Sequence, residues 1–216
     1  MKSRWLVLIA IVTLSVSACA QQLPSGAMEY STAFEREIPA GQSLPGTDIQ
    51  YLGKTDQGAQ MSIGGQAALK RALDSLTWRG EPVPGVSADY DLRIISFDDK
   101  VLQTGGTAKV VVSNAKAEAV SPASLPKDAL TFKGVVTYRV PKGKTIPGTT
   151  ITYDGKTSDG AKLGGIEGYA FRKEADSIAW VGKLSDKCFL QLDLRLLAYT
   201  DSAMQVTGTA TLYLTP

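Results

Sequence analysis

Residues 188–196 read Cys-Phe-Leu-Gln-Leu-Asp-Leu-Arg-Leu, with an apolar side chain at every second position. A period of two places the cysteine and the four leucines on one face of an extended chain, and this pattern predicts a half-buried β-strand. A polar turn at Thr200-Asp201-Ser202 follows, and residues 204–214 alternate again. The two runs together predict a long antiparallel hairpin with one face in the core.

The same hairpin pattern occurs earlier in the chain. Apolar and polar residues alternate in residues 90–94 and 102–112, on either side of a turn at Asp98-Asp99-Lys100. All of residues 30–114 align with residues 132–216 at a constant displacement of 102 positions, without a gap. Identities on this diagonal include Pro45-Gly46-Thr47, Gly53-Lys54-Thr55, Trp78, Gly80, Asp91-Leu92-Arg93 and Gly106-Thr107-Ala108. We interpret the alignment as a tandem duplication and expect both copies to share one fold.

The sequence therefore predicts an all-β protein built from two homologous antiparallel units, residues 30–114 and 132–216, each a small β-barrel or β-sandwich of about six strands. Residues 67–73 alone favour a helix, but their counterparts 169–175 alternate, so we expect strands in both. Residues 115–131, which contain Pro122 and Pro126, are the expected surface linker with one short helical turn. Units this small bury only about two-thirds of their unfolded surface. Packing of the units against each other, or their interleaving into one larger barrel or sandwich, is therefore expected.

The first 18 residues are typical of a secretory signal, because Lys2 and Arg4 precede an apolar run that is too short to span a membrane. The stretch Val16-Ser17-Ala18-Cys19 resembles the lipobox of bacterial lipoproteins. The resemblance implies cleavage before Cys19, a diacylglycerol on its sulfur and acylation of the new amine. It also implies a place in the bacterial cell envelope, with residues 19–29 as a tether. Ala20 stands where an inner-membrane retention signal would have an aspartate, which favours an outer membrane if there is one. The alternative is an ordinary signal peptide with an incidental cysteine.

The amino-acid composition limits which classes of catalytic and binding site the chain can form. The chain has no histidine, which excludes histidine-based triads and histidine metal ligands. Loss of Lys2 and Arg4 with the signal would leave 21 basic and 21 acidic residues, so the electrostatic footprint of nucleic-acid binding is missing. Gly53-Lys54-Thr55 lacks the earlier glycine of a phosphate-binding loop, so we expect no nucleotide. We also expect no metal and no cofactor.

Several repeated residues have a structural and a functional interpretation. Cys188 aligns with Val86, which favours a core position over a reactive thiol. Asp91 and Arg93, like Asp193 and Arg195, are expected to form a cross-strand ion pair, with a ligand-binding site as the alternative. Core packing is expected for two aromatic pairs, with sugar stacking as the alternative for the tryptophans: Trp78 and Trp180, Tyr51 and Tyr153. The aromatics on the outward phase would cover the junction of the units or bind a partner: Phe97, Phe189, Tyr199 and Tyr213.

These observations favour a lipid-anchored binding or scaffolding protein without catalytic residues, whose partner would be an envelope protein or a polysaccharide. The alternative is a carboxylate-based hydrolase that acts on envelope polysaccharide. Its acid would be Glu167, which stands in a glycine-rich turn and aligns with Gly65. Glu167 with Asp176, or Asp74 with Asp99, are the carboxylate pairs that such an enzyme could use.

Overall fold

The computed structural model describes residues 26–216 and is built almost entirely of antiparallel strands, which confirms the predicted all-β class. Residues 1–18 and Cys19 lie outside the described part of the chain. The first half holds a four-stranded sheet with the order β1-β7-β6-β5 and a three-stranded sheet with the order β2-β3-β4. Their bounds are β1 Met28–Pro39, β2 Ile49–Thr55, β3 Gly58–Ile63, β4 Gln66–Lys70, β5 Ser75–Val83, β6 Val86–Phe97 and β7 Val101–Val112.

The second half holds the same arrangement with one added strand. Its larger sheet has the order β8-β13-β14-β15-β9, and its smaller sheet has the order β10-β11-β12. The bounds are β8 Glu118–Ala119, β9 Leu130–Pro141, β10 Thr152–Lys156, β11 Ala161–Gly164, β12 Phe171–Arg172, β13 Ser177–Ser185, β14 Cys188–Tyr199 and β15 Ala203–Leu214. Strands β9, β13, β14 and β15 begin and end at the counterparts of the ends of β1, β5, β6 and β7.

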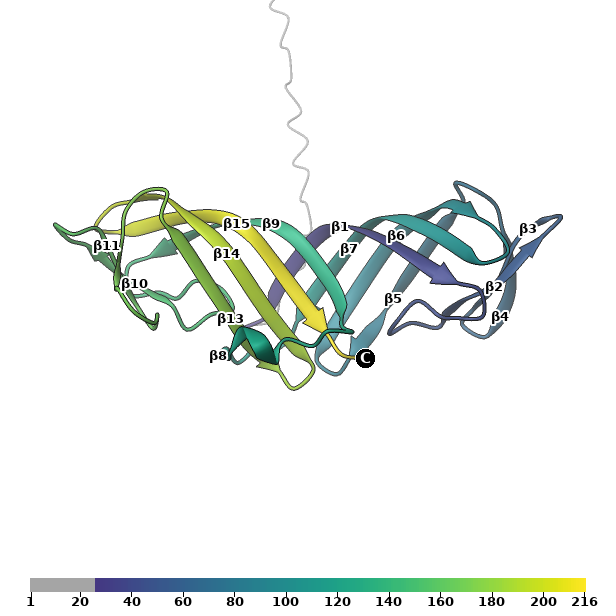
Figure 1. The fold of residues 1–216 in the computed structure, drawn as a ribbon, viewed down its shortest axis with the longest axis horizontal. Helices are drawn as coiled ribbons and strands as arrows, with labels where there is room; N and C mark the ends of the chain where they lie inside the picture. Colours follow the sequence, from purple (N-terminus) through teal and green to yellow (C-terminus); the bar gives the residue numbers. More distant parts are fainter. Residues whose placement is uncertain (1–25) are drawn as a thin grey trace, which may run out of the picture.

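The two larger sheets meet in the middle of the molecule, and the smaller sheets lie at its two ends (Figure 1). Both predicted hairpins are present, β6 with β7 and β14 with β15. The inward phase is buried as the alternation predicts, including every apolar residue at an even position from Cys188 to Leu196. Side chains of both halves belong to one continuous buried cluster.

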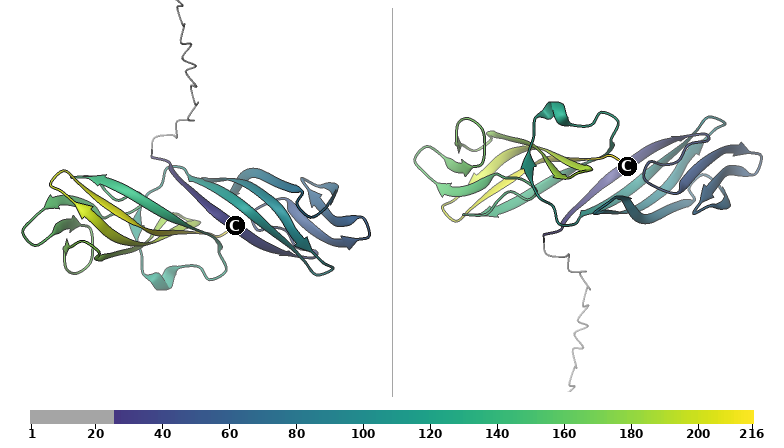
Figure 2. Two further views of the ribbon diagram at one scale, coloured as in Figure 1. Left: turned by 90° about the horizontal axis from the view of Figure 1, so that it is seen from above. Right: turned by 90° about the horizontal axis from the view of Figure 1, so that it is seen from below.

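Strands β1 and β9 cross where the halves meet, and their backbones lie close together (Figure 2). A Cβ on Gly134 would lie 3.2 Å from the Cβ of Thr32, which is its counterpart in the first half. Equivalent positions therefore meet at the crossing, as they would in a pair related by a two-fold axis. The hydroxyl of Thr32 donates to the carbonyl of Lys133, and the guanidinium of Arg36 donates to the carbonyl of Thr131 at 2.7 Å.

An aromatic stack joins the halves beside this crossing, and we call it the junction stack. The Phe34 ring lies 5.0 Å from the Tyr90 ring of its own half and 5.0 Å from the Phe132 ring of the other half. Trp78 extends the stack toward the sheet edge, 5.1 Å from Tyr90. Phe34, Tyr90 and Phe132 are all buried. Each half thus completes its core with side chains of the other half, because neither curled sheet is closed on its own.

The linker departs from the expectation of a plain connection. It contains the predicted helical turn, a short 3-10 helix at Pro122–Ser124. It also forms β8, which pairs with β13 and adds a fifth strand to the larger sheet of the second half. The amide of Val120 donates to the carbonyl of Val181 at 3.0 Å, and the linker follows the sheet edge there.

Residues 66–70 form the predicted strand β4, whereas the expected strand at 169–175 is reduced to Phe171–Arg172. Two glycines explain the difference. Gly165 and Gly168 have φ values of +68° and +77°, which bend the chain out of the sheet between residues 165 and 170. Tyr169 consequently projects into solvent with 67% of its surface exposed.

Candidate functional site

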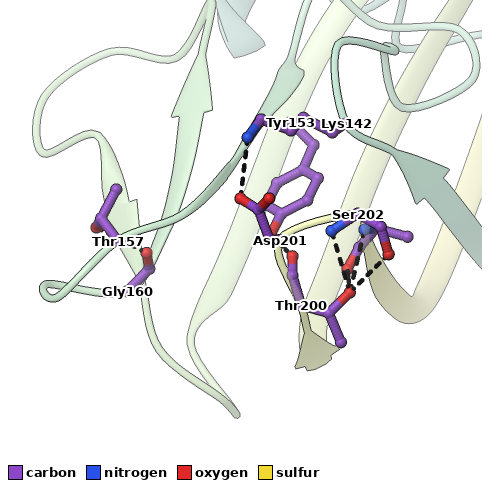
Figure 3. Close-up of polar contacts among 8 residues, drawn as sticks. Lys142, Tyr153, Thr157, Gly160, Thr200, Asp201 and Ser202 are labelled. Atoms are coloured by element: carbon purple, nitrogen blue, oxygen red, sulfur yellow. Dashed lines mark hydrogen bonds and ion pairs between the residues drawn. The ribbon is translucent and has the colours of Figure 1, made fainter.

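The repeated tyrosines are core residues, as expected, and each also holds a hairpin turn. Tyr51 and Tyr153 are fully buried, and their hydroxyls donate to the carbonyls of Asp98 and Thr200. In the second half the Thr200 hydroxyl also accepts from the amides of Ser202 and Ala203, and Lys142 pairs with Asp201 at 2.9 Å (Figure 3). This corner ties the smaller sheet to the β14–β15 turn, so it is structural.

The tryptophans pack against the core rather than forming open stacking platforms. Trp180 is 6% exposed and Trp78 is half-buried. Their indole N–H groups donate to equivalent positions, Asp48 at 2.9 Å and Thr150 at 3.2 Å. A Cβ on Gly80 would lie 2.4 Å from the Trp78 ring, and one on Gly182 would lie 2.0 Å from the Trp180 ring. The repeated Trp-x-Gly spacing therefore exists because each indole lies flat over the glycine.

The cross-strand ion pairs expected of Asp91 and Arg93, and of Asp193 and Arg195, are replaced by a different contact of the arginines. Among residues 26–216, neither Arg93 nor Arg195 is ion-paired with a carboxylate within 4.0 Å. The Arg93 guanidinium donates to the carbonyl of Leu73 at 3.1 Å, and Arg195 donates to that of Ala175 at the same distance. Leu73 and Ala175 have φ values of +70° and +69°, which non-glycine residues seldom adopt. Each arginine thus fixes a strained turn.

The aromatics expected on the outward phase divide into two groups. Strand β6 bulges between Ile94 and Ser96, and β14 bulges between Leu196 and Ala198. A bulge shifts the side-chain phase by one position. Phe97 and Tyr199 are therefore turned to pack against the core, and Ile95 and Leu197 are exposed in their place.

Phe189 and Tyr213 stay on the outer face, where they are cross-strand neighbours. The junction stack that joins the halves uses inward side chains, and Phe97 and Tyr199 pack against the core of their own half instead of lying on the outer face. For Phe189 and Tyr213, a surface that binds a partner stays a prediction. The sequence signal that could have located the junction is the aromatic content of the inward phase at Tyr30, Phe34 and Phe132.

The remaining repeated motifs and the free cysteine are structural. The Gly-Lys-Thr stretches enter hairpin turns, and Gly58 and Gly160 have the predicted positive φ, +147° and +136°. Cys188 is fully buried, and burial raises the pKa of its thiol to about 12. A neutral, enclosed thiol is a poor nucleophile, so this position has the expected core role.

The candidate carboxylates do not converge. The side chains of Asp74 and Asp176 accept the amides of Arg71 and Lys173, at 2.8 and 2.7 Å, and so close equivalent turns. Asp99 lies in the β6–β7 turn. Glu167 is exposed in the loop 165–170. Each of these acids therefore belongs to a separate turn or loop.

A groove in the second half is the best candidate site, and we call it the linker groove. It has a volume of about 570 Å³ and lies between the linker, the loop 165–170 and strand β13. Ile151, Ile178 and Trp180 give it apolar walls, Val120 closes the linker side, and Glu167 and Arg172 are its charged residues. The Arg172 guanidinium donates to the carbonyls of Ser177, Tyr169 and Phe171, so it holds the loop in place.

The first half has a different groove, of about 710 Å³, on the outer face of its larger sheet. Its lysine and arginine are already paired, Lys109 with Glu29 at 2.9 Å and Arg79 with Asp89 at 2.8 Å. Both basic side chains of this groove are therefore neutralised, and Asp91 is its remaining charged residue. We place the candidate site in the linker groove, which is bounded by elements that the first half lacks.

Within residues 26–216 there is no helix long and apolar enough to cross a membrane. The same residues contain no cluster of three or more side chains suited to hold a metal ion. Comparison of the chain with protein-family models, with curated proteins and with solved structures found no match.

Proposed function

We propose that this protein is a lipid-anchored component of the bacterial cell envelope that acts by binding an envelope protein or polysaccharide. Its two halves would descend from one duplicated β unit, with Cys19 carrying the lipid. The observation that carries the binding proposal is the linker groove, which depends on β8 and on the loop 165–170. Ligand sites typically combine apolar walls with a few polar groups, and this groove sets Ile151, Ile178 and Trp180 beside Glu167 and Arg172.

The groove is the place where the second half differs most from the first. In the first half, residues 66–70 continue the smaller sheet as β4, and Gly65 stands where Glu167 stands in the second half. The two halves share a framework and differ at this concave surface. Such a local difference fits a binding site that is specific to the second half.

The polysaccharide-hydrolase alternative would use the same groove, because Glu167 lies in it. Most glycosidases need two carboxyl groups on opposite sides of the bond that they cleave. Glu167 is the one carboxylate among the residues that line the linker groove. This composition supports binding more than hydrolysis.

A photo-crosslinking experiment tests the groove. A benzoylphenylalanine at position 169, beside the groove, is expected to form a discrete adduct in cells, whereas the same group at position 73 is not. Both Tyr169 and Leu73 are well exposed, at 67% and 70%, so the second position is a matched control. Ala179→Trp should abolish the adduct by filling the groove, and Glu167→Gln should preserve it.

Equal adducts from positions 169 and 73, or an adduct that survives Ala179→Trp, would contradict the binding site. Degradation of purified envelope polysaccharide by the wild-type protein, lost in Glu167→Gln, would establish the hydrolase instead.

Membrane attachment has its own test. Cys19→Ser removes the proposed acylation site, and two or three acyl chains are what would hold the protein firmly to the membrane. We expect the variant to leave the membrane fraction and to keep its signal peptide unprocessed at this position. Fractionation and the intact mass of the protein check both points. Membrane retention with unchanged processing would count against lipidation.

A further inference from the structure

The outer edges of β5 and β13 occupy equivalent places in the two halves but differ in whether another strand pairs with them. In the second half, β8 pairs with β13, so that Gly182 faces Ala119 and Lys183 faces Glu118. In the first half, no strand among residues 26–216 pairs with the outer edge of β5. An edge strand with free backbone groups is a template for another strand.

The free backbone groups of β5 follow from the alternation of an antiparallel ladder. The carbonyl of Val181, which accepts from β8, has its counterpart at Arg79. Residues 77 and 79 therefore direct their backbone groups away from β6, and a bulge follows between Gly80 and Val83. The start of the edge is already closed, because Lys70 donates to the carbonyl of Ser75 at 3.1 Å. Pro82 lies in the bulge between Gly80 and Val83, and the carbonyl of its counterpart Leu184 accepts from Lys116 of the linker. This end of the edge therefore offers a carbonyl but no N–H.

We propose that the β5 edge binds the β5 edge of a second copy of this chain, antiparallel, with the two Gly80 residues facing each other. This register places Arg79 of each copy opposite Glu81 of the other. The outer phase of β5 is suited to it: Thr77, Arg79 and Glu81 are all exposed, and 85% of the Arg79 side chain is accessible.

The contact of β8 with β13 serves as a template for this pairing. There, a basic Lys183 faces the acidic Glu118, and a small Ala119 faces Gly182. In the first half, an acidic Glu81 stands at the position of Lys183, so the added strand should carry a basic residue. The second copy supplies Arg79 at that place and Gly80 at the place of Ala119. Relative to the β13–β8 contact, the basic and acidic residues trade strands, while the register of the facing residues stays the same.

The present contacts of the two charged residues allow this pairing. Arg79 is bound to Asp89 at an exposed site, where an ion pair contributes little. Glu81 accepts the amide of Gly85 through one carboxylate oxygen, which leaves the other for an arginine. A continuous sheet through both copies would bury two edges that are otherwise open.

Cysteine crosslinking tests the register in membranes that contain the full-length protein. Facing residues in a hydrogen-bonded pair have Cα atoms about 5.5 Å apart, within disulfide range. Co-expressed Arg79→Cys and Glu81→Cys variants should form a disulfide dimer on mild oxidation, and either variant alone should form much less. The mixed dimer keeps one Arg79–Glu81 pair, and native Cys188 is buried.

Charge reversal gives a second, independent readout. Arg79→Glu should lower the dimer fraction measured by light scattering in detergent, and the double variant R79E/E81R should restore it, because the pairs reform with reversed signs. Restoration also shows that the variants fold. Equal crosslinking by single variants, no crosslinking at all, or a double variant as monomeric as Arg79→Glu would overturn the proposal. Crosslinks from position 79 to a different protein, with none between copies, would assign the edge to that partner and overturn it as well.

Discussion

Phe34→Ala is expected to lower the free energy of unfolding by about 3–5 kcal/mol, the usual cost of removing a buried phenylalanine. The ring is 3% exposed and belongs to the junction stack, with Tyr90 on one side and Phe132 on the other. Its loss would leave a cavity that neither sheet can close, because β1 is held in register along its whole length by β7.

The effect should reach both halves. Since the stack is shared, the urea unfolding transition should stay single and move to lower urea, and amide protection should fall together in β6 and β14. Hydrogen exchange followed by mass spectrometry distinguishes the halves. Phe97→Ala is the control, because Phe97 is half-buried and lies outside the junction stack. Two separate transitions, with protection lost in the first half alone, would show that the halves are independent.

Gly106→Ala is expected to destabilise the protein by about 3 kcal/mol, the upper end of what overpacking costs. A Cβ there would lie 2.1 Å from the carbonyl oxygen of Asp91 and 2.9 Å from the Cα of Leu92. Both atoms are backbone, so no side-chain rotation relieves the clash and β6 must move away from β7. Gly208, the counterpart, has the same 2.1 Å contact with the carbonyl of Asp193. Glycine in these strands therefore marks a close approach of backbones.

The neighbouring glycine provides the matched control. A Cβ on Gly105 would lie 2.8 Å from Cδ1 of Ile95, the end of a flexible side chain that is 52% exposed. We expect Gly105→Ala to change the free energy of unfolding by less than about 1 kcal/mol, since surface changes without a fixed clash are small. Urea denaturation of both variants measures the difference. Similar losses for the two variants would show that the contact of Gly106 with β6 does not decide the effect.

Most of the long strands could be predicted from the sequence, because alternating side chains and turn glycines act through neighbouring residues. The alternation in residues 188–196 is enough to bury Cys188 and the four leucines. The displacement of 102 positions predicts where β9, β13, β14 and β15 lie, given their counterparts. Gly58 and Gly160 indicate their turns because a positive φ is a conformation that other residues avoid. These features need only the preference of each residue for its own backbone geometry and for one side of a sheet.

The candidate site and the joining of the halves depended on contacts that no local pattern encodes. The Phe34 and Phe132 rings are 98 positions apart in the chain, and the crossing of β1 and β9 brings them together. The pairing of β8 with β13 rests on two residues, Glu118 and Ala119, that have no strand pattern of their own. The bulges at Ile95 and Leu197 reversed the phase of Phe97 and Tyr199, which a strict period of two does not foresee.

By itself, the sequence determined the two long hairpins, the buried side of their strands as far as the bulges and the correspondence of the halves at a displacement of 102 positions, because these depend on neighbours along the chain. The tertiary structure alone decided where the halves touch, which edge the linker covers and which edge it leaves open. Those outcomes are set by the curvature of whole sheets and by the space between them, which emerge only once the strands have paired.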